Sequence, residues 1–167
     1  MKEKTNVKIN LIRTILIVML IITFFIIFSF SNQDGEESGG LSRAITEGVT
    51  KNVKSIQKLE QTKKEKVLKR IEGIIRKIVH FSIYTLVGLL LMALFSTYKL
   101  KEFHRIGISL IIGIIYAISD EIHQMFIADR TSKATDVMID SFGVLFGILL
   151  VMLVIKLYKI KCGKNKF

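Results

Sequence analysis

Four long apolar runs, separated by polar segments, organise the chain. Nearly unbroken hydrophobic residues extend over about 11–31, 78–98, 106–125 and 136–158. An α-helix needs about 20 such residues to cross the hydrocarbon core of a bilayer, and each run approaches or exceeds that length. The pattern therefore predicts an all-α membrane protein, a four-transmembrane-helix bundle that forms a single domain over residues 1–167.

The first run could also be read as a secretory signal peptide, because Lys2, Lys4 and Lys8 precede it. Its apolar stretch is longer than the usual 7–15 residues of a signal, and no small-residue cleavage site follows it. We therefore expect a retained span.

A charged segment, residues 41–75, separates the first two runs. Its apolar residues recur at helical spacing, and charged residues fill the positions between them. That pattern is typical of an amphipathic helix or a broken pair of helices, with too much charge to span. We expect an amphipathic interfacial helix in the first loop, outside the membrane core. Docking on the outer surface of the bundle is the alternative.

Composition narrows the class of protein. Half of the 167 residues are hydrophobic, and the formal net charge is +11. No helix-turn-helix, zinc-finger or RNA-binding pattern accompanies this charge, so we expect no nucleic-acid partner. The basic residues instead flank apolar runs, where they contact membrane lipids with anionic head groups. Cys162 is the only cysteine, which excludes an internal disulfide.

The topology fixes the relative positions of the chain ends. Four spans place both termini on the same side of the membrane. Lys and Arg are divided almost evenly between the two sides, so the short connecting segments decide the orientation under the positive-inside rule. They favour both termini in the cytoplasm.

Most polar residues at membrane depth gather at one end of each run. In an up-and-down bundle, odd spans end on the side where even spans begin, so these ends share one membrane face. The residues are Ser29, Ser31, Gln33, Arg76, Lys77, His80, Tyr84, Asp120, Glu121, His123, Gln124, Asp136 and Asp140. Ionisable residues at such depth mark functional sites by default.

Helical geometry places several of them on shared stripes. In the fourth run, Asp136 and Asp140 lie on the same stripe as Gly143 and Gly147. A Gly-x-x-x-Gly stripe allows another helix to approach closely. We therefore expect this stripe to face the interior of the bundle.

Several chemistries suit this cluster. Paired carboxylates beside histidine can perform acid–base catalysis or relay protons, and carboxylates with imidazoles can hold a divalent metal. The cations can bind an anionic head group. The catalytic candidates are Asp120, Glu121, His123 and His80. The substrate-binding candidates are Lys77, Tyr84, Gln124, Arg130, Asp136, Asp140, Ser31 and Gln33. No His-Glu-x-x-His or Cys/His spacing occurs, so no metal or other cofactor is predicted. Mutual ion pairing, such as Arg130 with Asp136, would give the same residues a purely structural role.

At these residues the sequence resembles the VanZ-like family, named for an accessory protein of glycopeptide resistance in Gram-positive bacteria. The matching pieces are Phe30-Ser31-Asn32-Gln33, Lys77-x-x-His80-Phe81-x-x-Tyr84 with Gly88, Tyr116-Ala117-x-x-Asp120-Glu121-x-His123-Gln124-x-Phe126, then Arg130, Asp136, Asp140 and Gly143-x-x-x-Gly147. Two positions depart from the family pattern: Ile127-Ala128-Asp129 replaces a turn that often holds proline, and Asp140 stands where Asn is frequent.

The resemblance implies a multi-pass protein of the bacterial cell membrane whose founding relative is linked to teicoplanin-type resistance. It implies action on or near lipid-linked cell-wall precursors, and it supplies no specific reaction or oligomeric state. A small proton-coupled transporter and a non-catalytic interaction module that uses residues 41–75 are the alternatives.

Overall fold

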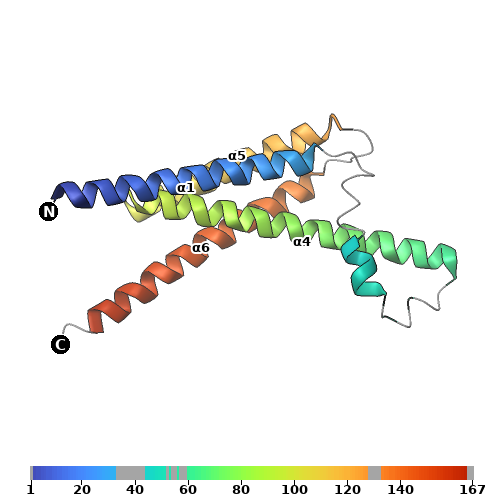
Figure 1. Ribbon diagram of the computed structural model, residues 1–167. Coiled ribbons are helices and arrows are strands. Elements are labelled where there is room, and N and C mark those ends of the chain that lie inside the picture. Colours follow the sequence, from blue (N-terminus) through green and yellow to red (C-terminus); the bar gives the residue numbers. More distant parts are fainter. Residues whose placement is uncertain are drawn as a thin grey trace.

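A computed structural model describes residues 2–32, 44–51, 53, 56, 60–127 and 133–164 (Figure 1). The long helices are α1 (Lys2–Ser31), α4 (Gln61–Ser96), α5 (Glu102–Gln124) and α6 (Ala134–Lys164). A short helix covers 44–50. Within the described residues, four helices are long and apolar enough to cross a membrane, which confirms the predicted all-α, four-span fold.

The helices run up and down, and the two termini lie at the same end of the molecule (Figure 1). Helices α1 and α5 lie side by side, whereas α6 crosses α4 and diverges from the bundle toward its C-terminus. The most extensive helix–helix contact joins α4 and α6. This topology brings the C-terminal ends of α1 and α5 to the same end as the start of α6.

Glycines make the α4–α6 contact possible. A Cβ atom added at Gly147 would overlap the carbonyl oxygen of Thr85, and one added at Gly143 would lie 2.6 Å from the carbonyl oxygen of Phe81. On the facing helix, a Cβ at Gly88 would overlap the carbonyl oxygen of Val144. The Gly143-x-x-x-Gly147 stripe therefore faces another helix, as predicted, and that helix is α4.

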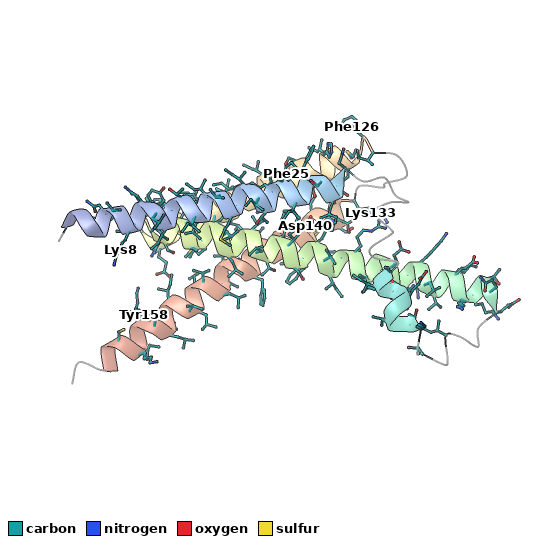
Figure 2. The ribbon with its side chains drawn as sticks, viewed as in Figure 1. Lys8, Phe25, Phe126, Lys133, Asp140 and Tyr158 are labelled. Atoms are coloured by element: carbon teal, nitrogen blue, oxygen red, sulfur yellow. The ribbon has the colours of Figure 1, made fainter. Side chains whose placement is uncertain are left out.

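The interior of the bundle is small and the outer surface is apolar. The core contains Ile27, Tyr84, Val87, Leu91, Met92, Ala117, Val144 and Ile148. Large apolar side chains project outward from all four long helices, and Phe25 of α1 is 69% exposed (Figure 2). An apolar exterior on helices of this length contacts lipid tails rather than water.

The charged segment before the second span is divided in the structure. Helix 44–50 covers one part of residues 41–75, and α4 begins at Gln61 and continues without a break to Ser96. The charged stretch 61–77 is therefore continuous with the second span, rather than ending at residue 75 before a new helix. No proline interrupts it, and the apolar spacing of Val67, Ile71 and Ile74 remains helical.

Arg13, the charge within the first apolar run, contacts protein rather than lipid. Its Nε donates to Thr97 Oγ1 at 3.0 Å, and Nη2 donates to the Thr97 carbonyl at 2.8 Å. The guanidinium lies 3.9 Å from the ring centroid of Tyr98. Arg13 thus joins α1 to the α4–α5 link at the end of the bundle where the termini lie.

Candidate functional site: a polar cavity at one end of the bundle

A cavity of about 180 Å³ lies between α4, α5 and α6, at the end of the bundle opposite the termini. Figure 2 places Asp140 among the packed helices and Lys133 beyond it, toward that end. The cavity is lined by Gly73, Arg76, Lys77 and His80 from α4, Glu121 and Gln124 from α5, and Lys133, Asp136, Ile139 and Asp140 from α6 and the residue before it. Charged residues that are distant in sequence therefore share one hollow.

His80 and Asp140 form the most deeply buried ionisable pair in the wall of the cavity. His80 Nδ1 lies 3.5 Å from Asp140 Oδ1, and the Asp140 side chain is 0% exposed. Neither His80 Nδ1 nor either Asp140 carboxylate oxygen makes a hydrogen bond within the described part of the chain. The two groups are close enough for an ion pair, but their separation exceeds the usual length of a hydrogen bond.

A hydrogen-bond network holds Asp120 nearby. The Tyr84 hydroxyl donates to Asp120 Oδ2 at 3.3 Å, and Gln124 Nε2 donates to the same oxygen at 3.1 Å. Gln124 Nε2 also lies 3.2 Å from Ser31 Oγ, its acceptor at the C-terminal end of α1. All four side chains are buried, so the network fixes the Asp120 carboxylate and links three helices.

His80, Asp120 and Asp140 converge on one point. Each offers a nitrogen or oxygen atom, and the three atoms all lie within 4.8 Å of one another. They come from α4, α5 and α6 respectively. The structure thus assembles one imidazole and two carboxylates from three helices.

The more exposed part of the cavity carries cations. Lys77 Nζ lies 3.6 Å from Asp136 Oδ1, and Arg76 Nη2 lies 3.7 Å from Glu72 Oε1. The Lys133 backbone N–H donates to Glu121 Oε2 at 3.2 Å. These cations lie on the side of the cavity nearest the charged stretch of α4 and the start of α6.

A family model described as VanZ/LLP1 matches residues 16–155. The chain belongs to the VanZ/LLP1 family. The matched range contains the whole cavity lining, and it confirms the family resemblance expected from the sequence. No curated protein and no solved structure matched the chain.

The VanZ/LLP1 chain does not gather every predicted site residue at the cavity. The His123 ring stacks on Phe28 of α1 with centroids 4.8 Å apart, and it does not line the hollow. Tyr84, Ser31 and Asp120 lie behind the lining in the hydrogen-bond network. Gln33 and Arg130 fall outside the described residues.

Sequence reasoning did not single out Lys133, Gly73 or Ile139, which line the cavity of this VanZ/LLP1 protein. Lys133 lies in the turn before α6, three residues before Asp136, and its main chain contacts Glu121. Gly73 and Ile139 carry no polar side-chain group, so they affect only the shape of the cavity, and no sequence motif identifies them as lining residues.

The arrangement combines an acidic interior with a cationic rim. Lys77, Lys133 and Arg76 can hold an anionic group by charge-assisted hydrogen bonds. Glu121 presents a carboxylate to the same hollow and can exchange a proton with a bound molecule. The volume suits a polar head group rather than a complete lipid.

Proposed function

We propose that this VanZ/LLP1 family protein is a multi-pass protein of the bacterial cell membrane that binds the phosphate-bearing head group of an envelope lipid. The cavity receives the head group, and the lipid tails remain in the bilayer beside the bundle. The observation that carries this proposal is the polar hollow of about 180 Å³ at the ends of membrane-spanning helices. A hollow of that kind suits a ligand that is polar at one end and apolar at the other.

The rim cations give the proposed site its preference for phosphate. Lys77 and Lys133 approach the hollow from α4 and from the start of α6, so a phosphate between them would contact both. Lys77 would then exchange its 3.6 Å contact with Asp136 for a contact with the ligand. A lipid-linked cell-wall precursor, which carries a diphosphate, has the required chemistry, and acting on or near it provides a route to teicoplanin-type resistance.

If the bound lipid is chemically changed, Glu121 is the preferred acid or base. Its side chain lines the cavity, whereas Asp120 is held behind the lining by Tyr84 and Gln124. Asp120 and His80 would then position the residues that line the cavity. His123 would contribute only by packing against α1. Glu121→Gln keeps the shape of the side chain and removes its capacity to act as a base.

The proposal is tested by lipid binding. Purified wild type, Lys77→Gln and Lys133→Gln are titrated with a polyprenyl diphosphate, with inorganic diphosphate and with phosphatidylcholine in detergent micelles. We expect polyprenyl diphosphate to bind preferentially, and each variant to bind it about tenfold more weakly, the loss of one charge-assisted contact. Lys101→Gln, at the opposite end of the bundle, is the matched control.

Equal binding of polyprenyl diphosphate by wild type and both rim variants would contradict the proposal. A second readout is cellular: the pool of lipid-linked precursors and teicoplanin susceptibility should differ between cells that express wild type and cells that express Glu121→Gln. A binding result without a cellular difference would restrict the function to head-group binding.

Proton-coupled transport is the second candidate, and one observation favours it. Asp140 is fully buried within a membrane-spanning helix, where acids of proton-coupled carriers reside. Flux into liposomes that requires a proton gradient and disappears with Asp140→Asn would establish transport instead of head-group binding.

A further inference from the structure

We infer that His80, Asp120 and Asp140 bind a divalent transition-metal ion between α4, α5 and α6. One imidazole nitrogen and two carboxylates form a donor set that Zn²⁺ and similar ions accept, and the nitrogen disfavours Mg²⁺ and Ca²⁺. The three ligands do not form a metal-binding motif with a fixed spacing in the sequence, because each one comes from a different helix. The inference stands apart from the lipid proposal, since an ion can bind whether or not a lipid does.

The geometry of the His80–Asp140 pair is the first argument. Metal–ligand bonds of about 2.0–2.2 Å set ligand atoms about 3.3–3.6 Å apart in a tetrahedral site. His80 Nδ1 and Asp140 Oδ1 lie 3.5 Å apart, and they do so without forming a hydrogen bond in the described chain. That spacing is long for a hydrogen bond and matches the separation of two ligands on one ion.

The third ligand lies within reach. All three donor atoms fall within 4.8 Å of one another, at most about 1.5 Å more than the edge of a tetrahedral zinc site. We expect side-chain rotation of His80 to close that difference, since the hydrogen-bond network holds the Asp120 carboxylate.

The burial of the Asp140 carboxylate is a second argument for a bound cation. Its side chain is 0% exposed, and neither carboxylate oxygen has a hydrogen-bond donor among the described residues. An ionised carboxylate in the membrane interior is costly unless a cation or several donors compensate it. A second carboxylate, Asp120, adds like-charge repulsion close by. A bound divalent cation would satisfy both carboxylates at once.

The surroundings of Asp120 match those of a metal ligand. Tyr84 and Gln124 both donate to its Oδ2, and they thereby fix the orientation of the carboxylate. Outer hydrogen bonds of this kind orient the ligands of metal sites and strengthen ion binding. The network therefore has a role beyond packing: it holds Asp120 in position before the ion arrives.

The ion would face the cavity. His80 and Asp140 belong to both the ligand set and the lining of the 180 Å³ hollow. Three protein ligands leave at least one coordination position for water or for an oxygen of a bound molecule, as in catalytic rather than structural zinc sites. Where the proposed head group also binds, its phosphate would meet this open position.

The test measures Zn²⁺ on the full-length protein in detergent without added lipid. Protein treated with a chelator is dialysed against buffered Zn²⁺, and bound metal is quantified by mass spectrometry with protein measured in parallel. We expect about one Zn²⁺ per wild-type chain, and at least 100-fold weaker binding for Asp140→Asn and for His80→Gln. The control is the double variant Glu102→Gln/His104→Gln, which removes a carboxylate and an imidazole at the opposite end of the bundle and should bind as wild type does.

Two results would overturn the inference: wild type that binds no Zn²⁺, or folded Asp140→Asn and His80→Gln variants that retain wild-type affinity. Size-exclusion elution and helical circular dichroism establish that each variant is folded.

If a variant fails to fold, the inference is tested instead by electron paramagnetic resonance of Cu²⁺ bound to wild type and to the control variant. Hyperfine coupling to a single imidazole nitrogen in both supports the site, and its absence from both contradicts it. Because these measurements contain no lipid and the lipid titrations can be run with a chelator, failure of one proposal is separable from failure of the other.

Discussion

Asp140 of α6 lies directly against His80 of α4, with Oδ1 and Nδ1 3.5 Å apart, one turn beyond the Lys77–Asp136 contact. One turn further along α6, Gly143 packs against the backbone of α4 beside Phe81. The charged pair and the glycine contact are thus consecutive parts of one helix interface. The close approach of the backbones is what brings the two polar groups together in an otherwise apolar bundle.

The glycine contact predicts a steric effect on stability. Gly147→Ala places a methyl group against the Thr85 carbonyl, and we expect it to lower the free energy of unfolding by about 1–3 kcal/mol, the usual cost of overpacking. Gly107→Ala in α5 has nothing within 4 Å of the added Cβ, so helix propensity alone should make it neutral or stabilising by up to about 1 kcal/mol. Thermal unfolding in detergent compares the two. Equal effects of the two alanines would mean that α4 and α6 are not packed this closely.

The buried pair predicts non-additive mutations. His80→Leu leaves the Asp140 carboxylate buried without its partner, and we expect a loss of up to about 3 kcal/mol. The double variant His80→Leu/Asp140→Val removes both polar groups and should recover most of that loss, because apolar replacements of buried pairs are often neutral. A double-mutant cycle on unfolding in detergent measures the coupling. Additive single effects would show that the two residues do not interact.

The Asp120 network predicts a smaller and separable effect. Tyr84→Phe removes the hydroxyl that donates to Asp120 and keeps the buried ring, so we expect about 1 kcal/mol of destabilisation. Tyr158→Phe is the control, because the Tyr158 ring is 68% exposed near the C-terminal end of α6 (Figure 2). The measurement is the shift in thermal midpoint of each variant. A midpoint for Tyr84→Phe that matches the control would indicate that the hydroxyl makes no net contribution.

The sequence was sufficient for the architecture because the bilayer constrains it strongly. Runs of about 20 apolar residues have few alternatives to spanning helices, and alternating topology then places Ser31, Gln124 and Asp136 at one end. The boundaries were less predictable. Hydropathy locates the apolar part of a helix, whereas α4 extends over the charged residues from Gln61 because nothing in 61–77 terminates a helix.

The detailed site was beyond sequence reasoning for a different reason. Periodicity assigns residues to one face of one helix, but the trio of His80, Asp120 and Asp140 depends on how three helices are rotated and shifted against one another. The same limit applies to His123, which lies three residues after Asp120 on α5 yet stacks on Phe28 of α1. Only the packed structure distinguishes a residue that lines the hollow from one that faces a neighbouring helix.

Membrane orientation gives a prediction that depends on no assumption about chemistry. The termini lie at one end of the bundle and the cavity at the other, so one labelling experiment places both (Figure 1). Cys162 is the only cysteine, and it is exposed near the end of α6. In intact cells, a membrane-impermeant maleimide should leave Cys162 unlabelled and should label Lys133→Cys made in a Cys162→Ser background. Both proteins should react after the membrane is permeabilised, which controls for local reactivity. The opposite pattern would place the cavity on the cytoplasmic side, and under the head-group proposal the ligand would then be a lipid of the inner leaflet.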